Sequence, residues 1–197
     1  MQKPLIIGIT GGIGGGKTTF SEFLQECGEL VFNTDREGRR LQNEDEQVIS
    51  EIKTLFGNDI YTPQGLNRSG IAKIVFNNKE KLNELNQIIH PRVKSEFLDW
   101  TRKHYNKKRL FMECAVLFEG DFNKLVDRVV VVTAPESVRI QRVMQRDNLD
   151  EQRVRERIKN QLSEEVKIKK ADWTVNTDNS EKSIQYVQDF LKKLEKQ

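Results

Sequence analysis

The chain has 197 residues, of which 36% are hydrophobic and 32% charged, and its formal net charge is +3. This length suits one α/β domain with a substantial core, and so small a net charge argues against a broad nucleic-acid surface. Its two cysteines lack CxxC spacing, which argues against a disulfide framework or a cysteine zinc site. No run resembles a signal peptide or a membrane span, so we expect a cytoplasmic protein without membrane partners.

Short apolar runs without alternation predict strands that are buried on both faces of a parallel sheet. Helical segments, such as "KTTFSEFLQECG" (17–28) and "SIQYVQDFLKKL" (183–194), alternate with these runs. This alternation is typical of an α/β fold with right-handed crossovers. The five predicted strands are "PLIIGIT" (4–10), "ELVFNTD" (29–35), "RLFMECAVLF" (109–118), "RVVVVTA" (128–134) and "WTVNT" (173–177).

Two helical intervals interrupt this alternation. Residues 63–105 contain no convincing strand and read as helices punctuated by Pro91, which indicates a helical insertion. Residues 136–170 are helical and dense in arginine, which indicates a lid. We therefore expect one domain, 1–197, with two mobile appendages. Its core would comprise residues 1–62, 106–135 and 171–197.

A glycine-rich loop between the first strand and the first helix is the most informative motif. "GGIGGGKT", residues 11–18, satisfies G-x-x-x-x-G-K-[ST], the P-loop pattern. Glycines let backbone N–H groups turn toward an anion, Lys17 can reach the β- and γ-phosphates, and Thr18 can bind Mg²⁺. The predicted fold is thus a P-loop three-layer fold that binds ATP with Mg²⁺. The ATP-binding candidates here are Gly11, Gly12, Ile13, Gly14, Gly15, Gly16, Lys17, Thr18 and Thr19.

Three classes of P-loop protein compete for this sequence. A switch GTPase needs Asp-x-x-Gly and Asn-Lys-x-Asp, but "DREG" (35–38) lies too close to the loop and "NKLV" (123–126) ends in valine. A motor ATPase needs an apolar strand that ends in acidic residues. The apolar run of "VVVVTAPE" (129–136) does not end in an acidic residue. A small-molecule or nucleotide kinase remains the favoured class, with a non-kinase ATPase or switch as the weaker alternative.

A kinase needs cations for the transferred phosphate and a carboxylate for the acceptor. Arg139, Arg142 and Arg146 share one face of a predicted lid helix, although the same row also fits a solvated, salt-bridged helix. Asp35 follows the second strand at the edge where open α/β sheets bind ligands. It is our candidate catalytic base and a second candidate magnesium ligand, against the alternative of a turn or cap residue.

The chain resembles the dephospho-coenzyme A kinase family over nearly its full length. The resemblance implies transfer of phosphate from ATP to the ribose 3′-hydroxyl of dephospho-coenzyme A, the last step of coenzyme A biosynthesis. It is carried by "GITGGIGGGKTT", "VFNTDREGRR", "GLNRSGIAKIVF", "LNQIIHPRV", "VLFEGDF", "VVVVTAPESVRIQRVMQRD" and "ADWTVNTD".

The resemblance also implies site residues. It assigns catalysis to Asp35, Lys17 and Arg142, and it adds Arg146 and Asn176 on the ATP side. The helical insertion would cover the acceptor, and we expect small-molecule substrates, no nucleic acid, and a monomer or weak homo-oligomer. The acceptor-side positions are Arg68, His90, Leu117, Phe118 and Glu119.

The chain departs from the family pattern at three places. Asn33 replaces the first aspartate of Asp-Ala-Asp, Ala115-Val116 replaces Pro-Leu, and Gly15 replaces a common serine. We expect the glycine to be tolerated, because the backbone binds the phosphates. We expect the asparagine to affect only a role of this position in orienting Mg²⁺. We expect Ala115 to affect the loop beside the acceptor.

Overall fold

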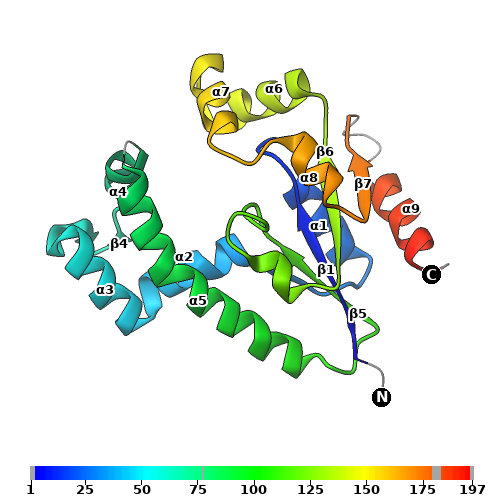
Figure 1. The fold of residues 1–197 in the computed structure, drawn as a ribbon, viewed down its shortest axis with the longest axis horizontal. Helices are drawn as coiled ribbons and strands as arrows, with labels where there is room; N and C mark the ends of the chain where they lie inside the picture. The colour runs from blue at the N-terminus through cyan, green and yellow to red at the C-terminus, as the bar shows by residue number, and fades with distance from the viewer. Residues whose placement is uncertain (1–2, 77, 179–182, 196–197) are drawn as a thin grey trace. The chain divides into compact units, whose positions relative to one another are not determined.

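The computed structural model describes residues 3–76, 78–178 and 183–195 (Figure 1). Its contacts divide the chain into two compact units, Met1–Asn33 with His104–Gln197, and Thr34–Lys103. The second unit therefore begins at Thr34, whereas the sequence pattern placed the start of the helical insertion at residue 63. Residues 34–62 join it because the helices that they form pack against the long helix of that unit.

The first unit is built on a five-stranded parallel sheet, as the sequence predicted. The strand order is β2-β5-β1-β6-β7, so the strand before the phosphate loop lies at the centre. Ile7 and Ile9 of β1 are fully buried, and so are Val130 and Val132 of β6, as expected for strands covered on both faces. The strands are β1 (Leu5–Thr10), β2 (Val31–Asn33), β5 (Arg109–Glu113), β6 (Arg128–Thr133) and β7 (Trp173–Asn176).

Helices α1 (Lys17–Glu26) and α9 (Ser183–Glu195) lie side by side on one face of this sheet (Figure 1). The ring of Phe190 lies 5.6 Å from that of Phe20 and 5.6 Å from that of Trp173, which joins both helices to β7. The β5 strand ends at Glu113 and not at residue 118, because residues 115–121 form a turn. This turn covers the other face, where Leu117 packs against Gly8.

The predicted lid belongs to the first unit. Its helices are α6 (Glu136–Asp147), α7 (Glu151–Lys159) and α8 (Glu164–Lys169). The short η2 (Phe122–Leu125) precedes β6 and lies outside the lid. Val143 and Val154 are fully buried in a small apolar cluster between α6 and α7, and Ile13 of the phosphate loop packs against this cluster. The predicted lid is thus packed on the loop in this structure, and its mobility stays a prediction.

The second unit is helical and centres on α5 (Lys79–Lys103), which buries Leu85, Ile89, Val93 and Phe97 at spacings of four residues. This helix runs continuously through Pro91, whereas the sequence pattern predicted a break there; Arg92 Nη1 donates to Ile88 O beside the proline. A two-stranded hairpin was also missed because its strands are so short. The other elements are α2 (Thr34–Glu44), α3 (Glu46–Phe56), η1 (Asn58–Ile60), β3 (Tyr61–Thr62), β4 (Gly65–Leu66) and α4 (Arg68–Phe76).

Candidate active site

The phosphate loop, residues 11–18, connects the central strand β1 to α1. Gly14 and Gly16 have φ angles of 77° and 90°, a left-handed conformation that glycine adopts without strain. A side chain at Gly15 would place its Cβ 2.6 Å from Val132 O, so serine could not enter without a backbone shift. Glycine at this position therefore fits the loop of this chain, and its tolerance for phosphate binding stays a prediction.

Lys17 and Thr18 open α1 at the end of the loop. Lys17 Nζ donates to Gly11 O at 2.9 Å and Gly12 O at 3.1 Å, so the ammonium lies over the loop itself. The Thr18 hydroxyl lies 3.0 Å from Glu113 Oε1 at the end of β5. Thr19 follows in the first turn of the helix and is exposed.

Glu113 is a site residue that the sequence interpretation missed. It is 7% exposed, and its second oxygen accepts a hydrogen bond of 2.8 Å from Asn33 Nδ2. The signal was present, since "RLFME" is an apolar run that ends in an acidic residue. The sequence interpretation sought such a residue after β6, but β5 is the strand that lies between β2 and β1. Thr18 and Glu113 offer oxygen ligands of the kind that Mg²⁺ prefers.

The three lid arginines occupy different environments. Arg142 Nη1 lies 3.4 Å from Gly14 O and 3.2 Å from Thr177 Oγ1, which holds this guanidinium at the loop. Arg146 instead pairs with Asp147, whose side-chain hydrogen bond raises the pKa of the guanidinium and lowers that of the carboxyl. The helical spacing thus identified the face, but only Arg142 and the buried Arg139 contact residues of the loop.

Residues 161–170, called the strap below, attach the lid to the loop. Gln161 Oε1 accepts from Ile13 N, and Glu164 Oε2 accepts from Gly12 N, each at 2.9 Å. The same Glu164 oxygen pairs with Arg139 Nη1 at 2.9 Å, and the Arg139 side chain is 5% exposed. Two amides of the glycine loop are therefore bonded to side chains of the strap.

The strap also contacts the 115–121 turn, where three acceptor-side candidates lie. Lys167 is fully buried, and its Nζ lies 3.1 Å from Glu119 Oε1 and 3.4 Å from Ala115 O. The ammonium of Lys170 lies 5.5 Å from the centre of the Phe118 ring. Leu117 is fully buried, so its side chain occupies a packing position in this structure. Acceptor contacts by these residues stay a prediction.

The remaining acceptor-side candidates lie in the second unit. Asp35 is exposed in the first turn of α2, and Arg68 is exposed at the start of α4. His90 lies within α5, where burial and the Lys94 charge lower its pKa while the Asp35 carboxylate opposes that shift. The electrostatic effect of Asp35 on His90 brings these two candidates into one neighbourhood of the unit.

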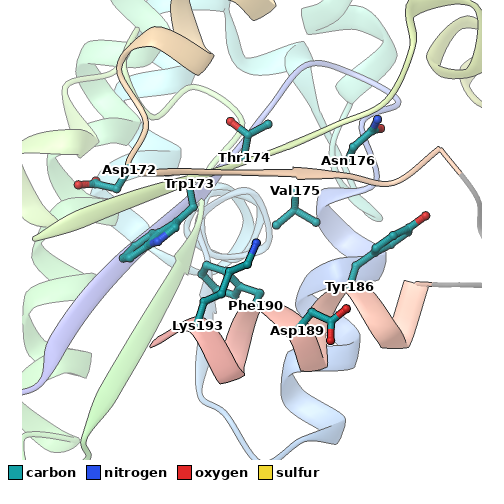
Figure 2. Close-up of a pocket in the computed structure, with 9 residues that line it drawn as sticks. All are labelled: Asp172, Trp173, Thr174, Val175, Asn176, Tyr186, Asp189, Phe190 and Lys193. Carbon is teal, nitrogen blue, oxygen red and sulfur yellow. The ribbon is translucent and has the colours of Figure 1, made fainter. Parts of the chain in front are cut away.

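Asn176, the candidate for the adenine side, is exposed at the end of β7. It lines a pocket of about 440 Å³ between β7 and α9, at the edge of the sheet. Figure 2 shows Val175 and Trp173 pointing toward α9, while Thr174 and Asn176 point to the other side of the strand. Among the described residues, none of the phosphate loop lines this pocket. An adenine contact by Asn176 therefore stays a prediction.

Comparison with known proteins gives a consistent result. The family model described as dephospho-CoA kinase matches residues 5–183. A dephospho-CoA kinase of Fusobacterium nucleatum is 36% identical, covering 98% of this chain and 96% of its own length. One of Leptospira interrogans is 40% identical, covering 87% of this chain and 84% of its own length. The chain belongs to the dephospho-CoA kinase family.

Solved structures agree with this assignment. The crystal structure of TT1252 from Thermus thermophilus matches with a TM-score of 0.84 at 30% identity, covering 96% of this chain and 97% of that one. A dephospho-CoA kinase from Campylobacter jejuni matches with a TM-score of 0.71 at 26% identity and 97% coverage of both chains. The resemblance noted from the motifs is confirmed. Across the described residues of this dephospho-CoA kinase family member, no helix is long and apolar enough to cross a membrane.

Proposed function

We propose that this protein transfers the γ-phosphoryl group of ATP to the ribose 3′-hydroxyl of dephospho-coenzyme A, giving ADP and coenzyme A. This is the last step of coenzyme A biosynthesis. The observation that carries the proposal is the dephospho-CoA kinase match over residues 5–183, which includes a complete phosphate loop. Phosphoryl transfer is catalysed mainly by positioning and charge stabilisation, which such a loop supplies.

On the donor side, we assign the triphosphate to the phosphate loop, residues 11–16, and to the Lys17 ammonium. The Gly12 and Ile13 amides would have to leave Glu164 and Gln161 to contact a phosphate. Thr18 and Glu113 would hold Mg²⁺, which would offset the negative charge of the phosphates. Arg142 would stabilise charge on the transferred group, because its guanidinium already lies at Gly14 O. Thr19, Arg146 and Asn176 stay as further candidates for ATP contacts.

On the acceptor side, we assign Asp35 as the carboxylate that orients the ribose hydroxyl and accepts its proton. Arg68 would bind a phosphate of the acceptor, since it is an exposed guanidinium suited to bidentate recognition. The pKa of His90 is lowered by burial, which favours the neutral imidazole, and a neutral imidazole donates through one ring nitrogen and accepts through the other. Phe118 and Glu119 complete the proposed set.

The experiment that tests this function presents several acceptors with Mg²⁺ and ATP. Dephospho-coenzyme A, nucleoside monophosphates and small alcohols would each be incubated with the protein, and mass spectrometry would identify which acceptor gains a phosphate. We expect phosphate on the ribose 3′-oxygen of dephospho-coenzyme A alone. Transfer to another acceptor would favour a different P-loop small-molecule kinase, and acceptor-independent ADP formation would favour a non-kinase ATPase.

A further inference from the structure

Thr177 is a buried threonine that follows the last residue of β7 and contacts the phosphate loop. It is 5% exposed, and its backbone N–H donates to Thr133 O at 2.7 Å, which continues the strand pairing with β6. Its hydroxyl lies 2.9 Å from Gly15 O. A Cβ built on Gly16 would lie 2.8 Å from the same hydroxyl, so Thr177 touches two successive loop residues.

The same threonine holds Arg142 through two different atoms. Arg142 Nη2 donates to the Thr177 carbonyl at 2.6 Å, and Nη1 donates to the Thr177 hydroxyl at 3.2 Å. A hydroxyl has one proton to donate and lone pairs that accept. The oxygen of this hydroxyl lies 3.2 Å from Thr133 O and 2.9 Å from Gly15 O, so Gly15 O is the nearer acceptor for its one proton while the oxygen accepts from Arg142. One side chain thus links a loop carbonyl to the guanidinium.

We propose that Thr177 is a positioning residue that fixes the Arg142 guanidinium relative to the phosphate loop. The proposal rests on the donor side of the proposed function, in which Arg142 acts on the transferred phosphate. Preorganised donors are effective because they require no rearrangement during the reaction. Arg146, one turn along the same helix, lacks such a role in this structure, because Asp147 holds its guanidinium.

The sequence pattern directed attention to the neighbouring residue. Asn176 is the ATP-side candidate that the resemblance implies in this strand, but alternation along β7 leaves it exposed. Thr177 reads in the sequence as a residue at the end of a strand, with no motif of its own. Its role follows only from the contact between the end of β7, the loop and α6.

The test compares substitutions that differ by the hydroxyl group. Thr177→Val keeps the shape of the side chain and removes the hydroxyl, so we expect kcat to fall about 10- to 100-fold, as for a misplaced catalytic group. The apparent KM for dephospho-coenzyme A should change less than about threefold, because uniform binding is untouched. Thr177→Ser keeps the hydroxyl and should restore kcat to within about threefold of the parent. Thr174→Val, the same change at an exposed site on β7, should leave kcat unchanged.

A double-mutant cycle separates positioning from a structural role. If Thr177 acts through Arg142, then Thr177→Val should slow the Arg142→Ala enzyme by less than about threefold. The proposal would be overturned if the fold-loss in kcat of the double variant equals the product of the two single fold-losses. Full activity of Thr177→Val would also overturn it. Circular dichroism and thermal unfolding check each variant, and Thr177→Ala, which only removes atoms, replaces the valine variant if that one does not fold.

Failure of the proposed function would look different from failure of this inference. A wild-type protein that transfers no phosphate to dephospho-coenzyme A would overturn the proposed acceptor. The same cycle would then be measured on acceptor-independent ATP hydrolysis, which uses the same loop and the same arginine. Additivity there would still overturn the role of Thr177, and coupling there would support it.

Discussion

Single residues of the donor site divide into those with a sequence motif and those that only the sheet brings together. The loop pattern identified Lys17 and Thr18, because the spacing G-x-x-x-x-G-K-T is itself the signal. Thr177 has no comparable motif, and the acidic end of "RLFME" indicates Glu113 only when β5 is known to lie beside β1. They reach the loop because β5 neighbours β1 and because β7 ends beside the loop, and strand order is not encoded in local composition.

The Glu113 carboxylate is expected to set the magnesium requirement. Glu113→Gln keeps an oxygen near the Thr18 hydroxyl but removes the negative charge that attracts the cation. We expect the Mg²⁺ concentration for half-maximal transfer to rise about tenfold, while calorimetric binding of magnesium-free ATP is unchanged. Glu22→Gln, at an exposed site on α1, is the control. An unchanged magnesium titration would remove Glu113 from the metal site.

Asp35 is expected to act on turnover and not on substrate binding. Asp35→Asn keeps the shape of the side chain and removes both the charge and the proton acceptor, so kcat should fall on the order of 10²–10⁴. The dissociation constants for ATP and dephospho-coenzyme A, measured by calorimetry, should stay within several-fold of the parent values. Asp59→Asn, an exposed aspartate of the same unit, should have no effect on kcat. Full activity of the Asp35 variant would exclude a base, and lost ATP binding would indicate a metal ligand.

At the scale of elements, the sheet and the lid differ in how readily they could be predicted. The apolar runs located all five strands, but two ends were misplaced: β5 ends at Glu113, and β2 ends at Asn33, so Asp35 lies in the first turn of α2 and not in the strand. Arginine density predicted a helical lid over residues 136–170, but it gave no indication of how these helices attach to the loop. That attachment depends on Ile13 packing between α6 and α7 and on the strap bonds from Gln161 and Glu164 to loop amides.

The strap is expected to depend on its buried cation for stability. Lys167→Met removes the partner of Glu119 from a site with no exposed side-chain surface. We expect a loss of about 1–3 kcal/mol in the free energy of unfolding, less than for a fully buried pair, since Glu119 is partly exposed. Urea unfolding followed by circular dichroism measures this loss. Lys169→Met, an exposed lysine of α8, should stay within about 0.5 kcal/mol of the parent. Equal stabilities for the two variants would mean that the buried pair is not stabilising.

At the scale of the whole molecule, the chain leaves the sheet unit after Asn33 and returns to it at His104. The sequence pattern indicated an inserted helical region but began it at residue 63, and it assigned residues 34–62, which include α2 and α3, to the core. Their helical periodicity is the same whether they pack on a sheet or on another helix. Only the packing of α2 and α3 against α5 assigns them to the second unit.

This division predicts that the two substrates depend on different units. Arg68 begins α4 in the second unit, whereas the phosphate loop lies in the first. If the second unit recognises the acceptor, Arg68→Ala should raise the apparent KM for dephospho-coenzyme A about tenfold or more, the loss expected for one charge-assisted contact. The apparent KM for ATP should change less than about threefold, because the donor contacts are intact.

Two further variants make the Arg68 measurement specific. Arg68→Lys keeps the charge but loses the planar fork, so its effect on the acceptor KM should be intermediate. Lys73→Ala removes an exposed cation from the same helix and should leave both KM values unchanged. Steady-state kinetics with each substrate varied in turn gives both KM values for the parent and for each of the three variants. Equal increases in both KM values for Arg68→Ala would assign the residue to the structure of α4. A selective increase in the acceptor KM for Arg68→Ala would place acceptor recognition in the helical unit. If Arg68→Lys then behaves like the parent, the positive charge alone, and not the planar guanidinium, accounts for that recognition.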